Sequence, residues 1–274
     1  MTAMDTLGPA NAPRSAGDAI VVSHLVKRFQ IRHRGSLKLK LLRATQRRFR
    51  QAATQPHMEQ KLALNDVSFT VPHGETVAVI GRNGSGKSTL MGLLARVYLA
   101  TSGTIGLFNA RGAQARVAPL LELGAGFHPD LDGNDNIEFY GAVLGLTSAQ
   151  VAEKYDQIVD FAELRDKMDT VVRTWNDGAR LRLGFSIAVH IDPDIVLIDE
   201  VLAVGDEAFQ NKCYRLLARM QTEGKTILVV SHDLVKVERV ASRIIWLSDG
   251  EIRMDGDMPT VLREYRQAAA GFTP

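Results

Sequence analysis

The chain has 274 residues, of which 45% are hydrophobic and 23% charged, a composition that excludes disorder throughout. The single cysteine, Cys213, excludes a disulfide framework and a cysteine-rich metal site. No apolar run approaches the roughly 18 residues that span a bilayer, and residues 1–17 read as a loose tail without the apolar core of a signal peptide. These features predict a soluble, intracellular protein that reaches a membrane only through a partner.

Charge is distributed unevenly along the chain. The formal net charge is +2, from 33 Lys and Arg against 31 Asp and Glu. Residues 31–61 hold nine basic residues and one acid, a balance of +8, which leaves −6 for the remainder. Such asymmetry points to an acidic partner or surface for that segment alone.

In chain order, the apolar patterns predict strands separated by helices. The expected strands are 19–26, 63–71, 76–80, 195–198 and 226–230, and a helix follows the third of them at about 87–98. Three more helices are expected between residues 131 and 189, at 136–144, 148–161 and 180–190. The predicted fold class is therefore α/β, with a helical insertion in the middle of the core.

The clearest motif is a glycine-rich loop that follows the strand 76–80 and opens a helix. It matches the pattern G-x4-G-K-[ST] in full, with Gly81, Arg82, Asn83, Gly84, Ser85, Gly86, Lys87, Ser88 and Thr89. Glycines let the backbone direct its N–H groups at phosphate oxygens, and the helix N-terminus favours an anion. Lys87 is expected to reach the β- and γ-phosphates, and Ser88 to ligate Mg²⁺.

Two further strand ends carry polar residues. Asp199 and Glu200 follow the apolar run 195–198, where a buried acid is costly unless it binds something. Asp199 suits the Mg²⁺ shell, and Glu200 could act as general base on an attacking water. His232 follows the strand 226–230 and could hydrogen-bond a γ-phosphate or position that water.

Together these motifs resemble the nucleotide-binding subunit of ATP-binding cassette (ABC) proteins, over roughly residues 19–263. The resemblance implies a P-loop NTPase with a RecA-like core, a helical subdomain at about 130–190 and an antiparallel β subdomain. It places the ATPase domain at 18–265, including the basic insertion 31–61, and a short tail at 266–274. The implied cofactors are ATP and Mg²⁺, with Lys87, Glu200 and His232 as catalytic residues.

The resemblance also implies further contacts. Phe29 is the candidate aromatic that stacks on adenine, and Asp206 matches the D-loop aspartate. The signature segment is Trp175 to Leu183, in which Asn176 and Gly178 are expected to contact the γ-phosphate held by a second, head-to-tail copy. It departs from the family pattern L-S-G-G-Q-x-x-R, since Asp177 replaces the first glycine. The segment 120–129 lacks the family's glutamine, and Glu122 is its nearest polar replacement and a possible Mg²⁺ ligand.

Within the family, the segments E-L-G-A-G-F-H-P and I-D-E-V-L-A-V-G-D-E-A-F-Q are similar to ATPases that export polysaccharides. That similarity implies a lipid-linked glycan as substrate, two membrane-spanning permease subunits as partners, and a place at the cytoplasmic face of the cytoplasmic membrane. The chain resembles the short type of these exporter ATPases, which lacks a C-terminal carbohydrate-binding domain. The alternatives are a soluble ABC ATPase acting on nucleic acid or ribosomes, and a P-loop kinase or GTPase, which the acidic pair and the strand-end histidine disfavour.

Three interpretations of the basic insertion remain open. It could be a solvated helix face, or an amphipathic segment at the inner leaflet with Leu37, Leu41, Leu42 and Phe49 on its apolar side. It could also bind nucleic acid, although only Phe49 offers an aromatic ring for base stacking.

Overall fold

The computed structural model describes residues 17–32, 58–121, 123, 126–199, 205–231 and 233–270. Most of the basic insertion, residues 33–57, lies outside this part of the chain. So do three predicted site residues, Glu122, Glu200 and His232.

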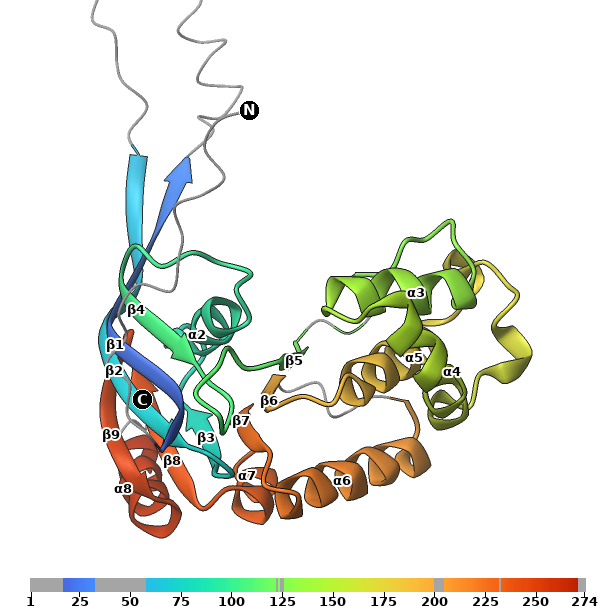
Figure 1. Ribbon diagram of the computed structural model, residues 1–274. Helices are drawn as coiled ribbons and strands as arrows, with labels where there is room; N and C mark the ends of the chain where they lie inside the picture. Colours follow the sequence, from blue (N-terminus) through green and yellow to red (C-terminus); the bar gives the residue numbers. More distant parts are fainter. Residues whose placement is uncertain are drawn as a thin grey trace, which may run out of the picture.

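Two sheets form the body of the molecule (Figure 1). The first is antiparallel, in the order β2-β1-β4, with β1 at Asp18–Arg32, β2 at Met58–Pro72 and β4 at Ser102–Leu107. The second has the order β5-β6-β7-β3-β8-β9, with β3 at Thr76–Ile80, β5 at Val117–Leu120, β6 at Ile195–Asp199, β7 at Thr226–Val230, β8 at Arg243–Ser248 and β9 at Glu251–Asp257. Neighbouring strands within this sheet are parallel, except β8 and β9, which are antiparallel.

Three of the five predicted strands, 76–80, 195–198 and 226–230, are the central strands β3, β6 and β7 of the second sheet. Every residue of β3 and β7 is buried, and both strands have the predicted bounds. A parallel sheet covered on both faces needs such continuous apolar runs. Because the strands are parallel, the carboxyl ends of β3, β6 and β7 lie at the same edge of this sheet.

The helices are α2 at Lys87–Leu94, α3 at Gly133–Val143, α4 at Ser148–Ala162, α5 at Asp177–His190, α6 at Glu207–Thr222, α7 at Leu234–Val240 and α8 at Met258–Ala270. Two short 3-10 helices occupy Arg165–Lys167 and Val172–Thr174. Helices α3, α4 and α5 stand to one side of the sheets and form the predicted helical subdomain (Figure 1). The predicted fold class, an α/β core with a helical subdomain and an antiparallel sheet, is therefore confirmed.

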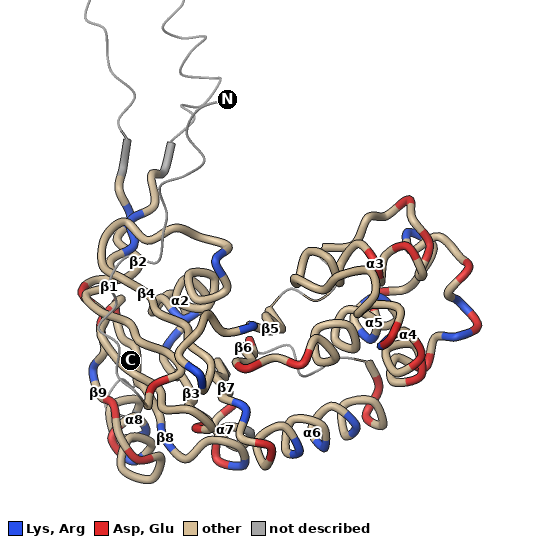
Figure 2. The backbone as a smooth tube through the Cα atoms, viewed as in Figure 1, with Lys and Arg blue, Asp and Glu red and all other residues tan. Residues whose placement is uncertain are grey.

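The apolar residues of the helical subdomain belong to a core cluster that continues into the second sheet and α6, and the subdomain carries a net negative charge. Ile158 of α4 and Leu183 and Phe185 of α5 are fully buried within it. Residues 130–190 hold eleven acidic and six basic side chains, a balance of −5, and red segments are frequent around α3 and α4 in Figure 2. Most of the −6 assigned to the chain outside the basic insertion therefore belongs to this subdomain.

Several predicted boundaries differ from the structure. The strands expected at 19–26 and 63–71 are longer, at Asp18–Arg32 and Met58–Pro72, and the helices expected at 136–144 and 180–190 each begin three residues earlier. Helix α2 ends at Leu94, not Tyr98, because Arg96 has a left-handed φ of 60° and the amides of Val97 and Tyr98 turn back to the Gly92 carbonyl. A Cβ on Gly92 would lie 2.6 Å from the Tyr98 ring, so this glycine admits the ring. Helix α8 continues to Ala270, past the boundary expected at residue 265.

Candidate functional site

The glycine-rich loop connects β3 to α2 through left-handed backbone conformations. Gly81, Gly84 and Gly86 have φ values of 155°, 84° and 105°, which side chains other than hydrogen rarely allow. A Cβ on Gly81 would lie 2.2 Å from the Leu247 carbonyl oxygen, and one on Gly86 2.6 Å from the Ala63 carbonyl oxygen. The loop can follow this path only with glycine at both positions.

Lys87 folds back across the loop that precedes it. Its Nζ donates hydrogen bonds to the carbonyl oxygens of Gly81 at 2.7 Å and Arg82 at 3.0 Å. Burial lowers the pKa of Lys87, and the carboxylate of Asp199 opposes that shift. The ammonium group is thus held at the mouth of the loop, where an anion would stabilise its charge.

Helix α2 differs from most other helices at its first turn. Side chains cap α3, α4, α5 and α6, namely those of Asp132, Thr147, Asn176 and Asp206. The N-cap of α2 is Gly86, and it provides no capping side chain. The first amides of a helix need partners, and a phosphate group is a strong acceptor for them. This first turn therefore fits a phosphate ligand.

One pocket of about 350 Å³ joins three parts of the sequence that were predicted to act together. Its walls are formed by Phe29, Lys61, Ala63, Asn83, Gly84, Gly86, Lys87, Ser88, Thr89, Asp199 and Val230. Gly81 and Ser85 are not among the lining residues of this pocket. Ser85 is only 4% exposed, and its Oγ lies 2.7 Å from the place where a Gly81 Cβ would be.

Phe29 reaches the pocket from β1, although an insertion separates it from the loop in sequence. Its ring is half-buried and meets the Tyr98 ring edge-on, with centroids 5.5 Å apart. Lys27 Nζ lies 4.8 Å from the Phe29 centroid. A planar base could stack on this ring, since aromatic faces suit such partners.

Lys61 belongs to the pocket and was not among the predicted site residues. It lies opposite Phe29 in the β1–β2 register, so the two side chains share one face of the ribbon. The pairing of β1 with β2 brings Lys61 into the pocket, although Lys61 follows Phe29 by 32 residues in the sequence. No local sequence pattern indicates this position.

The pocket offers two oxygen donors suited to Mg²⁺, Ser88 and Asp199. Burial raises the pKa of the Asp199 carboxyl, and Lys87 opposes this shift. Among the described residues no group of three His, Cys, Asp or Glu side chains could hold a metal. The donors that are present therefore fit a Mg²⁺ ion that also uses water and phosphate oxygens, which is its usual habit.

Asn176 and Gly178 do not line this pocket. Asn176 is the exposed N-cap of α5, and its Oδ1 accepts a hydrogen bond from the Ala179 amide at 2.8 Å. A Cβ on Gly178 would meet only that Oδ1, at 3.6 Å, so the first turn of α5 is open to a ligand from outside. Asp177 forms an ion pair with Arg180 on the same helix.

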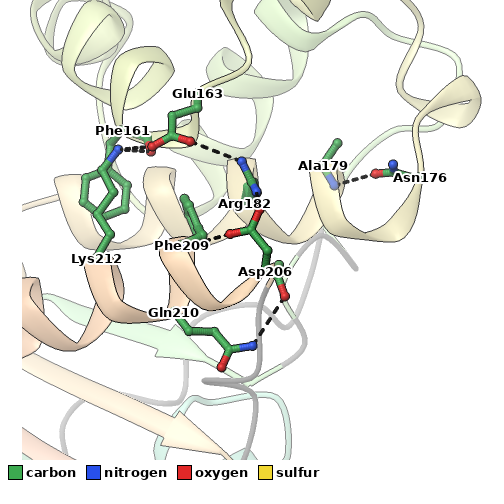
Figure 3. A network of polar contacts seen from close by, with 10 residues as sticks. Phe161, Glu163, Asn176, Ala179, Arg182, Asp206, Phe209, Gln210 and Lys212 are labelled. Atoms are coloured by element: carbon green, nitrogen blue, oxygen red, sulfur yellow. Dashed lines mark hydrogen bonds and ion pairs between the residues drawn. The ribbon is translucent and has the colours of Figure 1, made fainter.

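Asp206 is also outside the pocket, and both of its oxygens are engaged within the chain (Figure 3). Oδ1 caps α6 by accepting from the Phe209 amide at 2.9 Å, and Oδ2 accepts from Arg182 Nη2 at 2.6 Å. The Phe209 amide, and then Arg182, hold the pKa of Asp206 below its usual value. The structure thus gives Asp206 a helix-capping and ion-pairing role, and its partner Arg182 was not predicted as a site residue.

No helix in the described ranges combines the length and the apolar character needed to cross a bilayer.

Comparison with known proteins identifies the family of the chain. A family model described as ABC transporter matches residues 64–203. The O-antigen export system ATP-binding protein RfbB of Klebsiella pneumoniae is 44% identical over 209 residues, covering 76% of this chain and 82% of that protein. The RfbB protein of Myxococcus xanthus is 42% identical over 270 residues, and those residues span 94% of this chain but only 59% of the relative.

Two more comparisons extend this picture. The teichoic acids export ATP-binding protein TagH of Bacillus cereus is 42% identical over 204 residues, covering 74% of this chain and 36% of that protein. Among solved structures, the ATP-binding cassette MJ0796, dimeric and bound to ADP and Pi in a post-hydrolysis state, has a TM-score of 0.64 and 20% identity over 87% of this chain and 98% of its own. That likeness shows the fold. The chain belongs to the ABC transporter family and carries its ATPase domain.

Proposed function

We propose that the chain is the ATP-hydrolysing subunit of an exporter that moves a lipid-linked polysaccharide across the cytoplasmic membrane. The observation that carries the ATPase part is the pocket in which the glycine-rich loop, Lys87 and Asp199 meet. The transport part rests on relatives at 42–44% identity, which are named for O-antigen and teichoic acid export. These names also disfavour the alternative of a soluble ATPase acting on nucleic acid or ribosomes.

The pocket residues have separate tasks in this proposal. The α2 amides and Lys87 hold the phosphates, and Phe29 stacks on adenine. Ser88 and Asp199 hold Mg²⁺, which supplies positive charge against the phosphoryl oxygens when bound. Lys87 adds electrostatic stabilisation of the charge that develops during transfer. Glu200 removes the proton of the attacking water, and His232 contacts the γ-phosphate; Glu122 is a further candidate Mg²⁺ ligand.

A second copy of the chain completes the site in this proposal. Asn176 and Gly178 lie on an exposed helix start and line no part of the pocket in their own chain. In a head-to-tail pair, that helix start would face the phosphates held by the other copy, and a helix N-terminus favours an anion. ATP would then close the pair, and hydrolysis would open it.

The remaining partners follow from the transport role. Two membrane-spanning permease subunits would hold the pair at the cytoplasmic face of the membrane. Residues 32–50 of the basic insertion would lie against the anionic inner leaflet, where each surface cation contributes about 1 kcal/mol. Charge reversal at Arg43, Arg47 and Arg50 is then expected to lower export while sparing basal ATPase activity. Unchanged export would exclude the membrane contact.

The test begins with the isolated chain. Phosphate release from ATP is measured for the parent and for Glu200→Gln, which should retain ATP binding and lose most hydrolysis. The parent is then co-purified with a candidate permease subunit, and its ATPase rate is measured with and without a lipid-linked glycan. Parent-like hydrolysis by Glu200→Gln would remove this residue as the base. If the chain hydrolyses ATP but neither binds the permease nor supports export, the proposed transport role is rejected.

A further inference from the structure

Lys61 is the residue of the pocket wall that the proposed function leaves without a task. It lies on β2, two residues before Ala63, which also lines the pocket. Ala63 touches the phosphate loop, because a Cβ on Gly86 would lie 2.6 Å from the Ala63 carbonyl oxygen. Two residues of a strand span about 7 Å, so the Lys61 backbone lies that far along β2 from this contact. Lys61 therefore belongs to the part of the pocket that Phe29 forms, since the two residues are opposite in the β1–β2 register.

Two lysines lie close to the Phe29 ring, and the chain uses them differently. Lys27 Nζ donates a hydrogen bond to the Leu99 carbonyl oxygen at 2.8 Å and lies 4.8 Å from the Phe29 centroid. Lys27 does not line the pocket. The side chain of Lys61 is exposed, and within the described ranges its ammonium forms no hydrogen bond or ion pair. Lys61 is thus the lysine beside this ring that can bind a ligand.

The charges of the pocket wall separate into two regions. Its charged residues among those described are Lys61, Lys87 and Asp199. Lys87 and Asp199 each oppose the effect of burial on the pKa of the other, so they act together at the phosphate loop. Lys61 adds a second cation at the Phe29 end. An ammonium group has three hydrogen-bond donors and no acceptor, so it can bind a ring nitrogen of a purine but not an amino group.

The strand register restricts how a base can approach this cation. Directly opposite residues have Cβ atoms about 4.5–5.5 Å apart, which leaves no room for a base between Phe29 and Lys61. A base would instead lie against the Phe29 ring, where aromatic groups prefer an offset stack. The stem of Lys61 then passes beside the base, and its ammonium reaches the edge of the base.

We propose that Lys61 is a base-recognition residue: its ammonium donates a hydrogen bond to a ring nitrogen at the edge of the purine that stacks on Phe29. This inference rests on the proposed ATPase function and deepens it, because it assigns recognition of the base to a residue outside the phosphate loop. The contribution of Lys61 to affinity should be the same for ATP and ADP. The contribution of Lys87, which acts on the phosphates, should depend on how many there are.

The experiment compares Lys61→Met and Lys61→Arg with the parent, all as the full chain. Methionine keeps an unbranched stem and removes the donors, whereas arginine keeps a charged donor. The matched control is Arg28→Met. Arg28 is exposed, does not line the pocket and precedes Phe29 by one residue, so its side chain points to the other face of β1. Calorimetry without Mg²⁺ gives the Kd for ATP, ADP and the 1-deaza, 3-deaza and 7-deaza analogues of ATP.

Lys61→Met is expected to raise the Kd for ATP and for ADP by the same factor, about threefold to twentyfold. One of the three deaza analogues should bind the parent more weakly by a similar factor. That analogue should bind Lys61→Met as well as ATP does, because the variant and the analogue remove the same hydrogen bond. Lys61→Arg should stay within about threefold of the parent Kd. Arg28→Met should bind as the parent does, and the Tm of each variant should change by less than about 2 °C.

A larger loss for ATP than for ADP in Lys61→Met would overturn the proposal, because the ammonium would then act on the phosphates. Deaza analogues that lose the same factor with the parent and with Lys61→Met would also overturn it, as would an unchanged Kd for ATP. If the parent binds neither ATP nor ADP, the proposed function fails, and this outcome differs from binding by the parent and by Lys61→Met with equal Kd.

Discussion

Lys87 and Asp199 line the same pocket, and each opposes the effect that burial has on the pKa of the other. Burial lowers the pKa of the lysine and raises that of the aspartate, so desolvation disfavours both charged forms. A bound phosphate and a bound cation would supply the opposite charges that each group lacks. The pair is therefore built for ligands, at some cost to the stability of the chain alone.

Replacement of the carboxylate tests its role toward Mg²⁺. Asp199→Asn is expected to lower the ATPase rate at least about a hundredfold, because the amide removes the anionic ligand of the cation. The Kd for ATP measured in EDTA should stay within about threefold of the parent value. The parent in EDTA should lose activity to a similar extent. An Asp199→Asn variant with parental activity in Mg²⁺ would contradict this assignment.

Two glycines of the loop should respond differently to alanine. In Gly81→Ala the new Cβ would lie 2.2 Å from the Leu247 carbonyl oxygen, a backbone atom that cannot move cheaply, so the free energy of unfolding should fall by at least about 3 kcal/mol. Gly84 has no heavy atom within 4 Å of such a Cβ. Gly84→Ala should cost only the left-handed strain of about 1–2 kcal/mol. Urea unfolding monitored by tryptophan fluorescence measures both, and equal losses would argue against the close approach to Leu247.

The aromatic ring at position 29 should contribute to nucleotide affinity. Phe29→Leu is expected to raise the Kd for ATP about twofold to tenfold, because stacking of a base on an aromatic face is lost. Phe29→Trp should retain affinity. The matched control is Phe139→Leu on α3, an exposed ring at 45% exposure that does not line the pocket. Equal Kd values for the parent and Phe29→Leu would remove this residue from the site.

His190 should make the free energy of unfolding depend on pH. Burial lowers the pKa of His190 below 6.5, and its Nδ1 lies 2.6 Å from the Ser186 carbonyl oxygen. As the pH falls through 6.5, the unfolded chain binds the proton first, so stability is lost on acidification until the folded-state pKa is reached. Over that interval the loss is up to about 1.4 kcal/mol per pH unit.

In His190→Gln this contribution should be absent. The variant and the parent are compared by urea unfolding between pH 7.5 and 5. If the parent is more stable at pH 7.5, the difference between the two free energies of unfolding should become smaller as the pH falls. A constant difference over the whole range would show that His190 has the same proton affinity in the folded and unfolded chain.

The sequence by itself determined the phosphate loop and the central strands. Residues 81–89 are identifiable because the chemistry needs its glycines, lysine and hydroxyl at fixed local spacing. The bounds of β3 and β7 follow from apolar runs, since a strand buried on both faces must be apolar throughout. Asp199, the last residue of β6, could be identified because it ends such an apolar run.

Only the tertiary structure decided which distant residues meet. Lys61 reaches the pocket through its register opposite Phe29, and the end of α2 depends on the packing of Tyr98 against Gly92. Arg182 and Asp206 are 24 residues apart, and their pairing requires α5 and α6 to pack side by side. Local spacing encodes contacts within a turn or a strand, whereas strand register and helix packing are set by burial of the whole core.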